Sequence, residues 1–197
     1  LTTGACNIAL GVDALGAATI GLKNIAIGLD AMSGVTTGAA QCNVAIGFDA
    51  LKGDSNTVGD SNVAIGSFAG ASITTGKCNV AIGDNAMEAT TTGCNNIAIG
   101  ETALAVGVVT GGNNIAIGLS AMDVLTCGAC NIAMGSNALG ASTDGCDNIA
   151  IGQTALAASG NDADKNVAIG LLAMGTGDVS GACNIAIGVS ALSAVTS

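Results

Sequence analysis

Proline, tryptophan, tyrosine and histidine are all absent from this 197-residue chain. Its only aromatic side chains are two phenylalanines, which excludes the ordinary globular core that several large aromatic residues help to fill. The core must instead be thin and built from Ile, Val, Leu, Met and Ala. Without histidine, no nucleophile–histidine–carboxylate set can be assembled, so we expect no catalytic residues and no enzyme activity.

Positive charge is also scarce, because the chain has four lysines, no arginine and a net charge of −10. Binding to nucleic-acid phosphates needs clustered Lys and Arg, which this chain does not supply. Mean hydropathy is high at +0.65. Polar residues or glycine nevertheless interrupt every apolar stretch well before the roughly 20 residues that a membrane-spanning helix requires. We therefore expect neither a nucleic-acid partner nor membrane insertion.

The sequence is dominated by one motif repeated eleven times, Asn-[Ile/Val]-Ala-[Ile/Leu/Met]-Gly-x-x-Ala-[Leu/Met]. The asparagine, both alanines and the glycine are present in every copy, and Gly70 is the one departure at the final position. Successive copies start 17–19 residues apart, and the variation in length falls only between one motif and the next. Residues 1–197 are therefore a single repeat array, with copies starting at Asn7, Asn24, Asn43, Asn62, Asn79, Asn96, Asn114, Asn131, Asn148, Asn166 and Asn184.

A period of 17–19 residues is too short for helix-pair repeats, which need about 33 residues or more. Asn-Ile-Ala-Ile-Gly has the alternation that is typical of a short strand, and Gly and Asn suit the bends at its ends. We predict an all-β fold, a parallel β-solenoid or β-roll of about eleven coils with one repeat in each. At about 4.8 Å per coil, the stack would be a rod of roughly 50 Å.

Alternation along the strand assigns its residues to two faces. The residues on either side of the first alanine, such as Ile25 and Ile27, are predicted to fill the interior. The Ala and Gly positions then form a second face of small residues, which indicates the close approach of another surface. That surface is either a second copy of the chain, as in a homotrimer, or the other wall of the same coil. The structural residues predicted on this basis are Asn24, Ala26, Gly28, Ala31, Asn43, Ala45, Gly47 and Ala50.

The recurring asparagine is predicted to form a ladder, in which each amide hydrogen-bonds to the copies above and below it. Asp13, Asp30 and Asp49 occupy the same position in the first three repeats. Stacked carboxylates there would either remain solvated or hold a structural divalent cation. Apart from that cation, we expect no cofactor and no metal site.

Seven of the eight cysteines lie one or two residues before a recurring asparagine, and the eighth is Cys127. A zinc site would need a second Cys pair or histidine, so zinc is not indicated. Cys78 with Cys94, and Cys130 with Cys146, fall in adjacent coils, where stacking would bring their Cα atoms within reach of a disulfide. These are the predicted disulfides, and the isolated cysteines would be free, buried, or bridges between chains.

The combination Asn-Val-Ala-Ile-Gly-x-x-Ala-[Leu/Met] followed by Thr-Gly-x-x-Asn resembles two groups of repeats. One is found in tail fibres and appendages of phages and large viruses, and the other in the heads of YadA-like trimeric autotransporter adhesins. The resemblance spans essentially the whole chain and implies a homotrimeric, left-handed parallel β-roll. It further implies a structural or adhesive segment of an extracellular fibre, on a cell or virion surface. The expected partner is the chain itself, as a trimer or filament, with a host-surface receptor or glycan beside it.

Two other functions stay open from the sequence. Ile-Gly-x-x-Ala-x, as at residues 27–32, fits the hexapeptide pattern of left-handed β-helix acyltransferases, but only one hexapeptide fits in each repeat and histidine is missing. An ice-binding or other surface-binding solenoid would need a regular array of threonines. Seven threonines of the sequence fall in loops of variable length, which predicts that such an array loses its register between coils; they are Thr36, Thr37, Thr74, Thr75, Thr90, Thr91 and Thr92.

Overall fold

The computed structural model describes residues 4–17, 21–34, 40–53, 59–107, 109–158, 163–176 and 181–193. Within these ranges the chain forms eleven strands of three residues and no helix. The strands are β1 (Ile8–Leu10), β2 (Ile25–Ile27), β3 (Val44–Ile46), β4 (Val63–Ile65), β5 (Val80–Ile82), β6 (Ile97–Ile99), β7 (Ile115–Ile117), β8 (Ile132–Met134), β9 (Ile149–Ile151), β10 (Val167–Ile169) and β11 (Ile185–Ile187). The predicted all-β class is confirmed.

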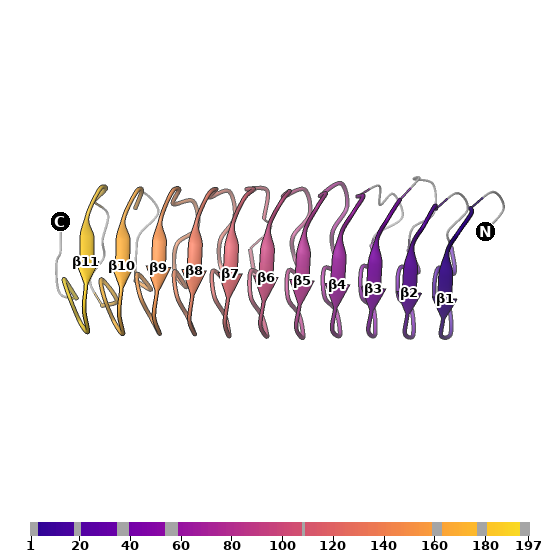
Figure 1. Ribbon diagram of the computed structural model, residues 1–197, viewed down its shortest axis with the longest axis horizontal. Helices are drawn as coiled ribbons and strands as arrows, with labels where there is room; N and C mark the ends of the chain where they lie inside the picture. Colours follow the sequence, from indigo (N-terminus) through magenta and orange to yellow (C-terminus); the bar gives the residue numbers. More distant parts are fainter. Residues whose placement is uncertain are drawn as a thin grey trace.

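All eleven strands belong to one sheet, in which each strand pairs with its neighbours in sequence. Every pairing is parallel and keeps the repeats in register, so that Ala26 lies beside Ala45 and Ala98 beside Ala116. Figure 1 shows the strands side by side along a rod, each joined to the next by one turn of the chain. We call each strand, with the asparagine and the two residues before it and the turn and loop after it, a coil. The predicted parallel β-solenoid is confirmed.

Tight bends close each coil. In the β2 coil, Lys23 (φ 58°), Asp30 (φ 56°) and Met32 (φ 54°) have left-handed backbone, and the same three positions recur in the other coils. This conformation costs about 1–2 kcal/mol for each residue other than glycine. Hydrogen bonds between coils offset it, since the Asp30 N–H donates to Val12 O and the Met32 N–H to Ala50 O, each over 3.0 Å. The ladder of hydrogen bonds thus continues through the turns.

The interior of the coils is not filled by the Ile and Val side chains that were predicted to occupy it. Ala26, at the centre of β2, is fully buried, whereas Ile25 and Ile27 on either side of it point outward and are only partly covered. The prediction that Ile and Val fill the interior is therefore wrong. A coil this short encloses little space, and Asn24 and Met32 occupy most of it. Only a methyl group fits in the space that remains beneath the strand, which explains the invariant alanine.

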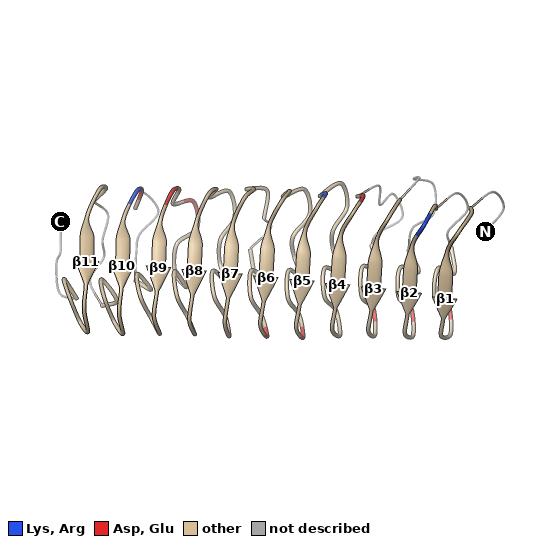
Figure 2. Cartoon of the chain, viewed as in Figure 1, with Lys and Arg blue, Asp and Glu red and all other residues tan. Residues whose placement is uncertain are grey.

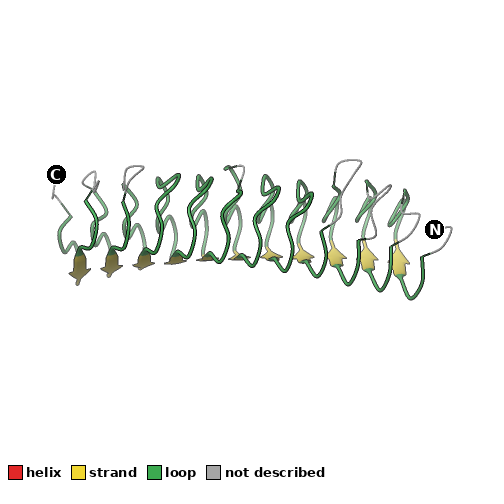
Figure 3. Cartoon of the chain, turned by 90° about the horizontal axis from the view of Figure 1, so that it is seen from above, coloured by secondary structure: helices red, strands yellow, loops and turns green. Residues whose placement is uncertain are grey.

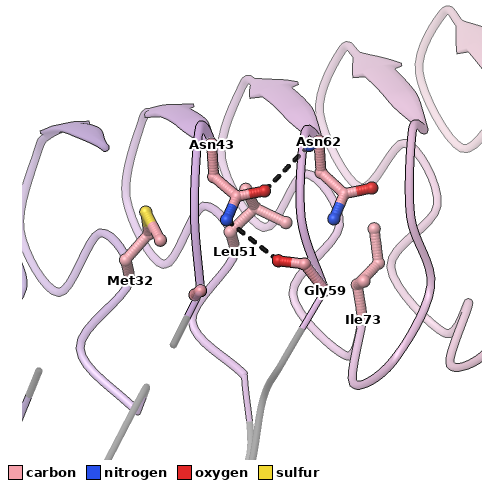
Figure 4. A pocket seen from close by; sticks show the side chains of 7 residues that line it. Met32, Asn43, Leu51, Gly59, Asn62 and Ile73 are labelled. Atoms are coloured by element: carbon pink, nitrogen blue, oxygen red, sulfur yellow. Dashed lines mark hydrogen bonds between the residues drawn. The ribbon is translucent and has the colours of Figure 1, made fainter. Parts of the chain in front are cut away.

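The asparagine ladder is confirmed. The Asn62 N–H donates to Asn43 Oδ1 over 2.8 Å, and Asn43 Nδ2 donates to Gly59 O over 2.9 Å (Figure 4). The same two bonds link the other described coils from Asn7 to Asn184. Buried amides that are fully paired in this way fix the register of the stack.

Contacts within the chain explain why glycine recurs at the end of each strand. Gly47 has a φ of 141°, and a Cβ on it would lie 2.3 Å from Gly66 O in the next coil. The small Ala and Gly residues are therefore required by the coil itself and by the coil stacked on it. The prediction that they contact a second chain is wrong, and the alternative, packing within the chain, is confirmed.

Gly70 interrupts the Leu/Met column without leaving it empty. A Cβ on Gly70 would lie 3.0 Å from Ile73 Cδ1 and 3.1 Å from Leu51 Cδ2, so these side chains fill the space. A small gap persists among Met32, Leu51 and Ile73, with the hydrogen-bonded Asn43 beside it (Figure 4). The gap lies within the core packing and offers no free polar group to a ligand.

Candidate interaction surface

The outward face of the sheet is the most distinctive surface of the rod. Its residues are the first and third of every strand from β1 to β11, and all of them are Ile, Val, Leu or Met. We call this the sheet face. Figure 3 shows the strands in one layer along one side of the rod, while turns and loops form the other sides. No described part of the chain covers the sheet face.

Partial exposure extends along the whole sheet face. Ile99 in the middle of the rod is 37% exposed and Met134 is 40% exposed, and Ile187 in β11 reaches 68%. Stacking against the neighbouring coils covers the rest of each central side chain. Covering what is still exposed would contribute about 0.5–1 kcal/mol per residue, or on the order of 10 kcal/mol over the rod.

Charge is confined to the borders of the sheet face. Figure 2 shows acidic and basic residues in the turns at either end of the strands and none on the strands themselves. Parallel sheets occur almost only with both faces covered. A contiguous apolar patch on a soluble protein marks an interaction site. The sheet face therefore has the composition of a buried surface, although none of the described residues covers it.

The three stacked aspartates do not come together as a cation site. Asp13 is exposed, whereas Asp49 is 4% exposed and its Oδ2 accepts a hydrogen bond from Lys52 Nζ over 3.0 Å. The other Asp49 oxygen, Oδ1, is buried without a hydrogen-bond partner. Among the described residues, no three His, Cys, Asp or Glu side chains are close enough together to hold a metal ion.

All eight cysteines are free thiols in the structure. Cys94 lies beside Lys77, one position out of line with Cys78. The Lys77 N–H accordingly donates a hydrogen bond to Cys94 Sγ over 3.3 Å. Cys146 is related in the same way to Cys130, and its Sγ accepts from the N–H of residue 129 over 3.4 Å. Neither predicted disulfide is formed, and the suggestion that isolated cysteines are buried is wrong for these exposed or half-exposed side chains.

Two pairs of threonine loops between β4 and β9 are in register, whereas Thr36 and Thr37 lie outside the described residues. The Thr74 N–H donates to Thr91 O over 2.9 Å, and the Thr126 N–H donates to Thr143 O over 2.7 Å. The hydroxyls of Thr74 and Thr126 also donate to these carbonyls, over 3.0 and 2.8 Å. These loops belong to repeats of equal length, and the bonds between them use the hydroxyl protons within the chain.

In the part of the chain that the structure describes, no helix is long and apolar enough to cross a bilayer. Comparisons with protein-family models, curated proteins and solved structures found no match. The class that the fold defines is a parallel β-solenoid with one uncovered apolar face. The side chains of that face are those predicted above to fill the interior. The invariant alanine at the centre of each strand was the feature of the sequence that could have revealed this, because a position that never holds a larger residue has little space around it.

Proposed function

We propose that this chain is a structural, non-catalytic segment of an extracellular fibre, on a virion or a cell surface, and that it assembles as a homotrimer through the sheet face. The observation that carries the proposal is the uninterrupted apolar surface along one side of a rod. Covering its sheet face supplies the free energy that holds parallel rods together.

A second copy of the chain is the partner that best fits the sheet face. Its side chains repeat at about 4.8 Å, the spacing of paired strands. A surface that matches such a row over eleven strands must carry the same repeat, and another copy does so by construction. The face has no charged residue that would orient a partner of different structure, so shape and spacing have to provide the match.

The number of copies follows from the resemblance to tail-fibre and YadA-like repeats, which implies three. Three rods around a common axis turn their sheet faces inward and close the assembly, as heterologous contacts do in a ring. The turns and loops then lie outside. A host-surface receptor or glycan would meet those outer surfaces, whereas the sheet face would remain in the centre.

Replacing Ile99 with aspartate tests the proposal. The side chain is 37% exposed in the single chain, so one rod tolerates a carboxylate there, while a trimer would bury three of them without counter-charges, at a cost of several kcal/mol. We expect the wild type to be trimeric in reductant and Ile99→Asp to dissociate to single chains, as measured by light scattering.

The matched control is Val106→Asp. Val106 is a 66% exposed apolar residue in the same coil but outside the strand, so this variant should remain trimeric. A circular dichroism melting curve confirms that each variant is folded. If Ile99→Asp keeps the wild-type mass while folded, the sheet face is not the contact between chains.

Ice binding is a second candidate, because the threonine loops between β4 and β9 are in register. The thermal hysteresis of a freezing solution tests it directly. We expect none, since Thr74 and Thr126 donate their hydroxyl protons to neighbouring loops and Val109 interrupts the row. A measurable hysteresis would favour a surface-binding solenoid over a fibre segment.

A further inference from the structure

One edge of the rod collects nearly all the thiols of the chain. It consists of the two residues that precede each recurring asparagine, and we call it the thiol edge. Its cysteines are Cys6, Cys42, Cys78, Cys94, Cys130, Cys146 and Cys183. All of them are free, and each side chain is exposed or half-exposed. Free cysteine is ordinarily among the most buried residue types, so a row of exposed thiols is unusual.

The backbone makes the choice of residue more unusual still. Cys6, Cys42, Cys78, Cys130 and Cys183 directly precede an asparagine and have left-handed φ values of 58–64°. Asn, Asp and Gly fit this conformation better than other residues, and Asn95 and Asn113 occupy it in two other coils. Cysteine therefore recurs at positions where neither burial nor backbone geometry favours it. Thiol chemistry is the property that these positions share.

Three of the thiols have no other cysteine in a neighbouring coil. Cys6 belongs to the coil of β1, Cys42 to that of β3 and Cys183 to that of β11, and the coils directly beside them contain no cysteine. Any other thiol is then two or more coil spacings away, about 10 Å or more along the rod. A disulfide needs Cα atoms within about 6.8 Å. These three cysteines can form disulfides only with another molecule.

The charges of the thiol edge are balanced, unlike those of the rest of the chain. It contains three lysines, Lys23, Lys77 and Lys165, and three aspartates, Asp60, Asp147 and Asp164. Its net charge is therefore zero, and the net charge of −10 arises from the rest of the chain. Figure 2 shows the lysines of this edge along the upper ends of the strands, with carboxylates alone at the lower ends.

One ion pair lies on the thiol edge. Lys77 Nζ lies 3.0 Å from Asp60 Oδ2, and this hydrogen bond, with the attraction between the two charges, raises the pKa of Lys77 above its usual value. The two opposite charges of this pair both lie on the thiol edge and cancel each other. Two neutral edges approach without the repulsion that two strongly acidic surfaces would meet.

We propose that the thiol edge is a covalent docking surface for a second copy of this chain, joined through Cys6, Cys42 and Cys183. Each link forms one Sγ–Sγ bond between two chains. A small-molecule disulfide such as oxidised glutathione is the oxidant, and it is reduced to two thiols that receive the two protons. The identical edge of another copy supplies both the thiols and the neutral surface, so the contact is self-complementary.

The proposed disulfides and the proposed trimer contact use different surfaces of the rod, the thiol edge and the sheet face. Around a threefold axis, the thiol edge of each chain would lie beside the far end of the strands of the next chain, where the sequence places no cysteine. Like edges would therefore meet only between assemblies, and the disulfides would tie neighbouring fibres side by side. The docking inference itself does not require the trimer, because two single rods present the same edges.

The test is oxidation of the full chain after reductant has been removed. Wild type is incubated with oxidised glutathione and run on a denaturing gel with and without reductant. We expect covalently linked chains that reductant separates, and peptide mapping should place Cys6, Cys42 or Cys183 in the bonds between chains. Serine fits these positions, because Ser61 occupies the same place with a φ of 59°.

Two serine variants make the result decisive. The triple variant Cys6→Ser, Cys42→Ser, Cys183→Ser should lose the linked species. The matched variant, in which Cys78, Cys94, Cys130 and Cys146 are replaced by serine, should keep it. The proposal is overturned if wild type yields only single chains carrying glutathione, or if the triple variant links as well as wild type does. Trimer formation is measured separately in reductant, so the two proposals can fail independently.

Discussion

Replacing Gly100 with alanine is expected to destabilise the rod by more than about 4 kcal/mol. Gly100 has a φ of 137°, which side chains other than glycine rarely adopt, and a Cβ there would lie 2.5 Å from Gly118 O in the next coil. Neither the strained backbone nor the contact can relax alone, because the Gly100 N–H donates to Ile82 O over 2.8 Å and fixes the coil from the other side.

The control for this prediction is Gly140→Ala. Gly140 lies in a turn without the left-handed backbone, and a Cβ on it would meet Asn137 O at 3.1 Å, which a small shift relieves. Chemical denaturation followed by circular dichroism compares the two variants with wild type. We expect Gly140→Ala to lie within about 1 kcal/mol of wild type. Equal effects of the two substitutions would refute the close contact between coils.

Loss of one buried asparagine is expected to cost about 3–5 kcal/mol, because each buried polar group that is left unpaired costs about 1–3 kcal/mol. In Asn114→Ala, the Asn131 N–H loses Asn114 Oδ1, which lies 3.0 Å away. Gly128 O loses the Asn114 amide donor at 2.9 Å. Both groups lie in the interior, where no water replaces the missing partner. The unfolding midpoint in denaturant measures the loss.

Asn113→Gly provides the comparison within the same coil. Asn113 is exposed and has a φ of 61°, which glycine adopts readily. This variant should unfold within about 1 kcal/mol of wild type. The contrast between adjacent asparagines separates the hydrogen-bond ladder from the general cost of altering the repeat. If Asn114→Ala is as stable as Asn113→Gly, the ladder does not hold the coils together.

The path of the chain could be predicted from the sequence, because its repeat leaves few choices. Constant length from each asparagine to the following Leu/Met fixes the strand and its turns, as for Asn43 to Leu51. Variable length elsewhere marks the loops. A repeat of this length with one strand stacks in parallel and in register, and a buried Asn at each step follows from the hydrogen bonds it can make between coils.

Which side of the strand faces inward could not be predicted from alternation alone. Alternation separates Ile97 and Ile99 from Ala98 without saying which set is enclosed, and the larger residues are the usual choice for an interior. The deciding quantity was the space within the coil, which depends on how sharply the left-handed turns bend. Asn96 and Leu104 fill that space, so the isoleucines are left outside.

The loops and thiols depend on details that sequence spacing does not contain. Thr74 and Thr91 lie in repeats of equal length, but spacing does not reveal that the Thr74 hydroxyl donates to Thr91 O. Cys78 and Cys94 lie in adjacent coils but in different columns, and a shift of one residue is enough to separate their side chains. The spacing of the repeats predicts the coil in which each residue lies, whereas the direction of its side chain comes from the structure.

The mass of the wild-type chain in solution, measured by light scattering in the presence of reductant, tests the central claim most directly. The account predicts three times the chain mass of 18.5 kDa, because the sheet face is then covered by two further copies. A stable species of 18.5 kDa would contradict it, since the apolar face would then remain in water without a partner.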